Sequence, residues 1–196
     1  PVLHIFPHWN WHNGQTVDIW AYYNNADEAE LFVNGISKGV RRKNDSLLHV
    51  MWRVKYEPGK IKVATRKAGN IVLEKEICTA GKPYAIRLVP ERSLLESNNY
   101  DVVFIKVEII DSNGIVVPTA KVKIDFEIKG KGTIAGVDNG YQAYIEPLKA
   151  NYCYTFNGKC VVAIKSTLSP GKIVLKAKSH NLKPDMIKLR SKKKIY

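Results

Sequence analysis

Three histidines and two tryptophans crowd the first twelve residues, and two kinds of chemistry use such side chains. His4, His8 and His12 are spaced by four residues, and imidazole is a common ligand for zinc and other transition metals. Trp9 and Trp11 lie between them, and the face of an exposed indole ring can pack on the C–H surface of a sugar. The segment therefore suggests either a metal site or a carbohydrate-binding surface.

A metal site requires the three imidazoles to reach one ion. A helix would bring them onto one face, but Pro7 and Gly14 oppose a helix here. In an extended chain, residues four apart are separated by about 13 Å, at roughly 3.3 Å per residue. A histidine nitrogen binds zinc at about 2 Å. We therefore expect no metal site in this segment.

The cysteines do not predict a metal site either. Cys78, Cys153 and Cys160 make an odd number, and none of them has the CxxC spacing of a zinc or redox site. A disulfide between Cys153 and Cys160 across a turn remains an open alternative. We expect the chain to use no cofactor.

Carboxylates are the other groups that could do chemistry. Asp125 and Glu127 alternate with apolar residues, as on the polar face of a strand, whereas Asp138 and Glu146 fall in an irregular region. Nothing in the sequence places a pocket around either pair, and the motifs GxSxG and HExxH and a glycine-rich phosphate loop are absent. We predict no catalytic residue in this chain.

Alternation of apolar and polar residues with a period of two dominates the sequence, which predicts an all-β protein. Asn34-Gly35 predicts a type I′ turn between two of the strands, and Trp20 and Trp52 are expected in the core. Strands are expected at residues 16–23, 29–33, 36–40, 51–56, 60–66, 71–77, 84–90, 101–110, 121–128, 132–137, 159–166, 172–178 and 185–189.

The break TAGKP, residues 79–83, is rich in small residues and proline and marks a domain boundary. Short strands joined by short turns on both sides of it are typical of immunoglobulin-like folds. The sequence thus predicts two tandem immunoglobulin-like β-sandwich domains, residues 1–80 and 81–196.

Residues 136–158 form a long excursion between strands, rich in aromatic residues, Asn and Gly. Long ordered loops often carry function, so Asp138, Asn139 and Tyr141 are candidates for carbohydrate binding or an interface. The alternative is a loop that only packs on its own tyrosines.

The formal net charge of +13 raises the question whether the chain binds nucleic acid. Residues 81–196 carry most of the excess, with 20 Lys and Arg against 10 Asp and Glu. Most of these lysines alternate with apolar residues, as on a solvated strand face, so we expect no nucleic-acid partner. No apolar run approaches the roughly 20 residues of a membrane span, so we expect no membrane partner.

The order of several motifs resembles a known family. HIFPHWNWHNGQTVDIWAYYNNADEAELFVNGISKG and MWRVKYEPGKIKVATRKAGN resemble the domain that follows the catalytic barrel in bacterial family 2 glycoside hydrolases of the β-galactosidase type. GKGTIAGVDNG, EPLKANYCYTFNGKCVVAIKS and SPGKIVLKAKSHNL resemble the C-terminal immunoglobulin-like domain of the same enzymes. The resemblance covers nearly the whole chain.

The resemblance implies a non-catalytic fragment that packs on and positions the catalytic barrel of the same parent chain. It implies a retaining, periplasmic or extracellular glycosidase whose two catalytic glutamates lie in the barrel, before Pro1. FPHWNWHNG, residues 6–14, would be the first strand after the barrel. His8, Trp9 and Trp11 would then be interface residues, and we predict that Trp9 or Trp11 is exposed in this chain.

A second interpretation is a stand-alone glycan-binding or adhesin-like surface module. Trp9, Trp11 and the loop 136–158 would then recognise an oligosaccharide. Immunoglobulin-like folds serve many functions, so the fold alone does not decide between the two.

Overall fold

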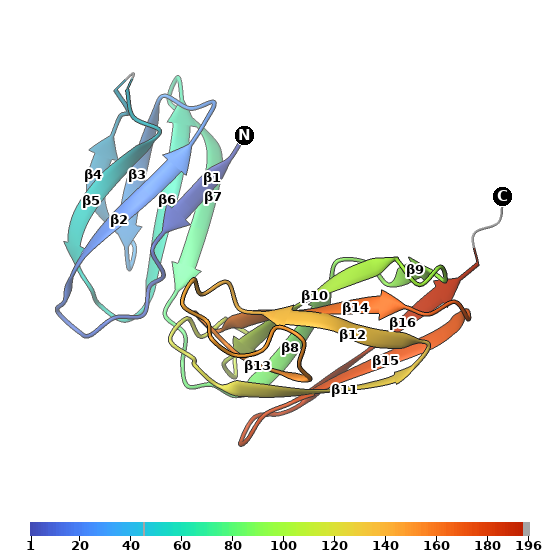
Figure 1. Cartoon of the computed structure of the whole chain (residues 1–196). Coiled ribbons are helices and arrows are strands. Elements are labelled where there is room, and N and C mark those ends of the chain that lie inside the picture. The colour runs from blue at the N-terminus through green and yellow to red at the C-terminus, as the bar shows by residue number, and fades with distance from the viewer. Residues whose placement is uncertain (45, 194–196) are drawn as a thin grey trace. The chain divides into compact units, whose positions relative to one another are not determined.

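The computed structural model describes residues 1–44 and 46–193, which form strands, turns and irregular segments without a helix. The chain divides into two compact units, Pro1–Ala80 and Gly81–Tyr196 (Figure 1). The predicted all-β fold with two immunoglobulin-like sandwiches is confirmed. In the described residues there is no helix with the length and apolar character needed to cross a membrane.

The first unit is a sandwich of two antiparallel sheets that enclose one core. The three-stranded sheet has the order β1-β2-β5 and the four-stranded sheet the order β4-β3-β6-β7. Alternate residues of both sheets point inward, among them Ile19 and Leu31, which are fully buried. The strands are β1 (Leu3–Phe6), β2 (Thr16–Tyr23), β3 (Glu28–Val33), β4 (Ile36–Arg41), β5 (His49–Lys55), β6 (Lys60–Lys67) and β7 (Asn70–Cys78).

The predicted turn at Asn34-Gly35 is confirmed. Both residues have positive φ angles, 49° and 84°, as a type I′ turn requires. The Asn34 side chain also holds the neighbouring turn, because its Oδ1 accepts from the Lys60 N–H at 2.8 Å and its Nδ2 donates to the Pro58 carbonyl at 3.1 Å.

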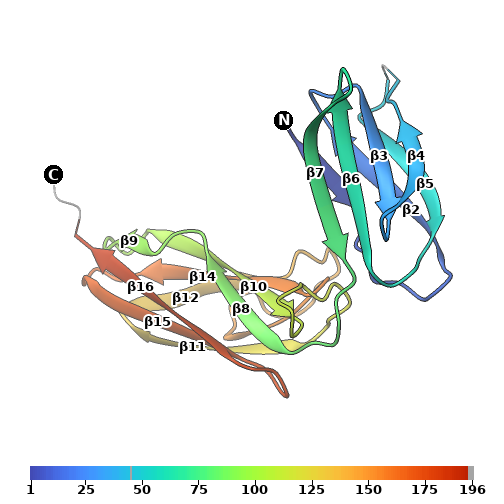
Figure 2. The same cartoon turned by 180° about the vertical axis from the view of Figure 1, so that it is seen from behind.

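The second unit is a larger sandwich, seen from both sides in Figures 1 and 2. One sheet has the order β12-β14-β10-β8 and the other β13-β11-β15-β16-β9, in which β9 runs parallel to β16. The strands are β8 (Ala85–Pro90), β9 (Leu94–Glu96), β10 (Val102–Ile110), β11 (Lys123–Gly130), β12 (Gly132–Asp138), β13 (Tyr152–Tyr154), β14 (Lys159–Ser166), β15 (Gly171–Lys178) and β16 (Asp185–Lys192).

Candidate functional site

The N-terminal aromatic segment belongs to the core of the first unit. Residues 7–15 are not a strand, and the strand expected over FPHWNWHNG lies earlier, at β1. The Trp9 side chain has 0% of its surface exposed, and its ring meets that of Tyr56 edge-on at a centroid distance of 4.9 Å. Its Nε1 donates to the Glu57 carbonyl at 3.1 Å. The prediction of an exposed Trp9 is therefore wrong.

Trp11 and His8 pack on each other beside this core. Their rings stack at a centroid distance of 4.5 Å, and the Trp11 Nε1 donates to the His8 carbonyl at 2.8 Å. Both side chains are half-buried, and burial lowers the pKa of the His8 imidazole. Trp11 is thus half-buried and not fully exposed, and an interface at His8 and Trp11 stays a prediction.

The segment is anchored to the end of the unit by Asn10. Its Nδ2 donates to the Ala80 carbonyl and its Oδ1 accepts from the Ala80 N–H, each at 2.9 Å. His4 lies in β1 and His12 begins the turn 12–15 at the end of the segment, and both are exposed. The described residues contain no group of three or more His, Cys, Asp or Glu side chains that could hold a metal ion.

Trp20 is not in the core, contrary to expectation. Trp52 is buried, but Trp20 lies on the outer side of the sheet β1-β2-β5. Its ring is 6.1 Å from that of Phe6 and stacks on that of His49 at 5.2 Å, with planes inclined by 20°. We call the outer side formed by Phe6, Trp20, Tyr22, His49 and Met51 the aromatic face.

The long excursion contains the short strand β13 and a concave site that we call the loop hollow. The loop hollow has a volume of about 530 Å³. The exposed rings of Tyr141 and Phe156 contact each other at its side, at a centroid distance of 4.8 Å. It is lined by Lys121, Asn139, Tyr141, Ala143, Tyr144, Ile145, Glu146, Tyr154, Thr155 and Phe156.

Two of the three loop residues predicted from the sequence line this hollow. The Asn139 amide fixes the loop, because Nδ2 donates to the Tyr154 carbonyl and Oδ1 accepts from the Tyr141 N–H, each at 2.9 Å. Asp138 does not line it: its Oδ1 accepts from the N–H groups of Asn139 and Gly140, at 2.7 and 3.1 Å. Phe156 also lines the hollow; it belongs to the excursion 136–158 but was not singled out from the sequence, because only the fold brings it against Tyr141.

The carboxylates around the hollow do not form a catalytic pair. Glu146 is the only carboxylate among the residues that line it, and it accepts from the Tyr152 hydroxyl at 2.8 Å, which raises the pKa of Tyr152. Asp125 and Glu127 lie on a strand and pair with Lys123 and Lys178. Glycoside hydrolysis needs a second carboxylate to act as nucleophile or base.

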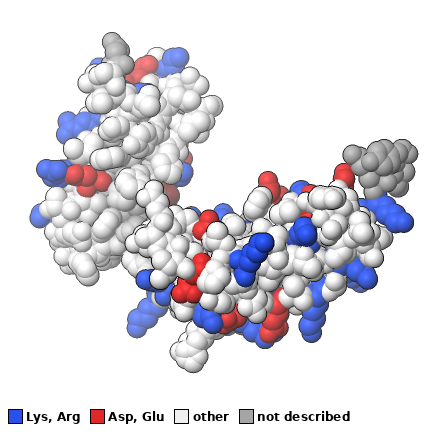
Figure 3. Space-filling view, in the orientation of Figure 1, with Lys and Arg blue, Asp and Glu red and all other residues white. Residues whose placement is uncertain are grey.

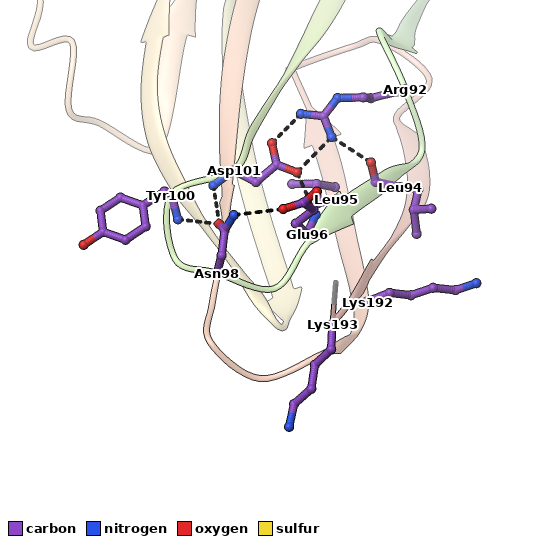
Figure 4. Close-up of a pocket in the computed structure, with 9 residues that line it drawn as sticks. All are labelled: Arg92, Leu94, Leu95, Glu96, Asn98, Tyr100, Asp101, Lys192 and Lys193. Atoms are coloured by element: carbon purple, nitrogen blue, oxygen red, sulfur yellow. Dashed lines mark hydrogen bonds and ion pairs between the residues drawn. The ribbon is translucent and has the colours of Figure 1, made fainter. Parts of the chain in front are cut away.

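A second hollow, of about 790 Å³, lies beside β9 and the last described residues (Figure 4). Arg92 donates to Asp101 at 2.6 Å and to the Leu94 carbonyl at 2.7 Å, and Asp101 accepts from the Glu96 N–H at 2.7 Å. Figure 4 shows the Tyr100 side chain pointing away from this network. The charges neutralise each other and hold the turns on either side of β9, so this network is structural.

Fold and sites together define a pair of immunoglobulin-like domains. Residues 86–188 match the family described as Glycoside hydrolase family 2 C-terminal domain 5, and residues 14–73 match Domain of unknown function DUF4982. The chain belongs to glycoside hydrolase family 2, in agreement with the resemblance of its motifs.

The similar proteins are much longer than this chain. Beta-galactosidase BoGH2A of Bacteroides ovatus is 51% identical over 188 residues, which are 96% of this chain and 22% of that protein. A glycosyl hydrolase family 2 member from Bacteroides cellulosilyticus is 32% identical with a TM-score of 0.88, over 95% of this chain and 24% of that one. A β-glycosidase from Bacteroides vulgatus is 30% identical with a TM-score of 0.89, over 96% and 24%. The chain thus spans about a quarter or less of these relatives.

Proposed function

We propose that this chain is the non-catalytic C-terminal part of a β-galactosidase-like glycoside hydrolase and that it packs on the catalytic barrel of the same parent chain and positions it. The similarity to Beta-galactosidase BoGH2A carries this proposal, because it extends over 96% of this chain but only 22% of that protein. The remaining four fifths leave room for a barrel with the two glutamates of a retaining glycosidase.

The carboxylates of this chain support a non-catalytic role. The buried carboxylate of Glu108 is held by Arg87 at 2.7 Å and by Lys106 at 2.9 Å. Burial alone would raise its pKa, but these hydrogen bonds prevail and lower it, so Glu108 stays ionised and cannot serve as a proton donor near neutral pH. The loop hollow offers only one carboxylate. On this proposal, the acid and the nucleophile come from another part of the parent.

The proposal is tested with the parent glycosidase and a truncated form that lacks this chain. We expect the truncated form to lose activity on an aryl β-galactoside at a lower temperature than the parent, because the barrel has lost the domains that hold it. Equal activity and equal thermal inactivation of the two forms would contradict the proposed role.

We also propose that the loop hollow contacts oligosaccharide near the catalytic part and so shapes sugar access. Supporting this, Tyr141 is 48% exposed and Phe156 38% exposed, so their ring surfaces are accessible to a sugar. Glu146 and Lys121 add hydrogen-bonding groups at the same site. A few polar groups around aromatic side chains are typical of small-molecule sites.

A further inference from the structure

The two sheets of the first unit present different outer sides. On the four-stranded sheet, ion pairs link neighbouring strands: Lys60 with Glu76 and Lys62 with Glu74, each at 2.9 Å. Arg66 pairs with Glu30 at 2.7 Å on the same side. Such a charged surface is typical of a sheet face in contact with water.

The aromatic face, on the three-stranded sheet, is formed by aromatic and apolar side chains instead of ion pairs. Phe6 and Met51 flank Trp20 on the adjacent strands, and Tyr22 pairs with His49 in the next row. Phe6 is 52% exposed and Met51 41% exposed. Figure 1 shows this sheet turned toward the viewer, and Figure 3, in the same orientation, shows few charged side chains over it.

The ring geometry of the aromatic face suits a protein surface better than a sugar. Trp20 and His49 are nearly parallel with centroids 5.2 Å apart, so the imidazole covers part of one face of the indole. Aromatic side chains beside a methionine are typical of the centre of a protein interface. The charges at its border are balanced, because Arg53 pairs with Asp18 at 2.7 Å.

We propose that the aromatic face is the surface on which the catalytic part of the parent glycosidase packs. The proposal rests on the function proposed above and adds the face and the residues that form the contact. The matching family is described as a C-terminal domain, so we infer that the catalytic part precedes this chain and joins it next to β1, the strand that carries Phe6. An exposed apolar patch beside so much additional chain is best explained as its docking surface.

The two methionines of the chain provide the test. Met51 lies on the aromatic face, and Met186 lies on β16 of the second unit with 52% of its surface exposed. Both are oxidised by hydroxyl radicals in proportion to their exposure, and mass spectrometry reads each site separately. In the 196-residue chain we expect both to react, and in the parent we expect the reactivity of Met51 relative to Met186 to fall several-fold.

A pair of matched variants provides a second readout. Met51→Glu places a charge on the aromatic face, and Ile71→Glu places the same charge at an exposed position of β7, on the other sheet. In the isolated chain both variants should unfold at the same temperature as each other. In the parent, Met51→Glu should lower the temperature of thermal inactivation, and Ile71→Glu should not.

The outcomes separate this inference from the proposed function. If Met51 reacts equally in the parent and in the isolated chain, the aromatic face is not the docking surface. Protection of Met51 already in the isolated chain would also overturn the inference, because another part of this chain or a second copy would then cover the face. If removal of the whole chain leaves the parent unchanged, the proposed function itself fails.

Discussion

The indole ring of Trp9 meets the phenol ring of Tyr56 edge-on inside the first sandwich, with centroids 4.9 Å apart. Trp9→Ala should therefore leave a cavity in that core and reduce the free energy of unfolding by about 3–5 kcal/mol. Urea denaturation of the 196-residue chain, followed by circular dichroism, measures this loss.

Trp11→Ala is the matched control, because Trp11 is half-buried and lies at the border of the same core. Trp11→Ala should reduce the free energy of unfolding clearly less than Trp9→Ala. Equal losses for the two variants would contradict the assignment of Trp9 to the core and of Trp11 to its edge.

Asp111 is expected to make the second sandwich sensitive to acid. Burial raises the pKa of its carboxyl, but hydrogen bonds from the backbone N–H groups of Gly81, Ile115 and Asn113 prevail, so the pKa lies below its ordinary value of 3.8. Because the pKa of Asp111 is lower in the folded state, its ionised carboxylate stabilises the fold fully above pH 3.8. This stabilisation disappears as the pH falls through the pKa of Asp111 in the folded state.

Asp111→Asn should reduce the free energy of unfolding at pH 7 by about 1–3 kcal/mol, because a neutral amide accepts these hydrogen bonds less well. The difference from the unsubstituted chain should shrink below pH 4, where Asp111 becomes protonated. Asp125→Asn, at an exposed ion pair with Lys123, should cost less than about 1 kcal/mol. A difference at Asp111 that persists unchanged into acid would contradict this explanation.

Most of the strands can be predicted from the sequence, because apolar and polar residues alternate along a half-buried strand. The expected strand 16–23 coincides with β2, and 159–166 coincides with β14. The strands that were missed are short. β13 has only three residues, and its pairing with β11 depends on residues far away in the sequence.

The side-chain environments were harder to predict, and Trp20 shows why. Alternation places Trp20 on the same side of β2 as Thr16 and Asp18, and Ile19 on the other side, so the polar residues mark the side of Trp20 as the outer one. The expectation of a buried Trp20 followed instead the usual burial of tryptophan on alternating strands of immunoglobulin-like domains. Trp9 is buried by contacts with residues near position 57 and by the Asn10 anchor to Ala80. Such long-range contacts leave no local signal in the sequence.

The thiols of the second sandwich should be protected in the folded chain. Cys153 and Cys160 are buried, so a bulky reagent cannot reach them in the folded chain. An aromatic disulfide reagent should therefore modify only the half-buried Cys78 in the folded chain. All three thiols should react in guanidinium. A single reactive thiol after unfolding without reductant would instead reveal a Cys153–Cys160 disulfide.

The loop hollow is tested by titrating the 196-residue chain with galactose-containing oligosaccharides and following the chemical shifts of the loop residues. Tyr141→Ala should weaken binding by about 0.5–1.5 kcal/mol, since it removes one ring surface. Tyr100→Ala, at an exposed tyrosine of the second hollow, should leave the affinity unchanged. Equal affinity of the Tyr141→Ala variant and the unsubstituted chain would exclude the loop hollow as the site.

The hydrolysis of an aryl β-galactoside, measured side by side for the parent glycosidase and for the 196-residue chain at equal molar concentration, tests the central claim most directly. The account predicts turnover by the parent and none above the buffer rate by the chain alone. Turnover by the chain alone would contradict it, because the chain would then hold an acid and a nucleophile of its own.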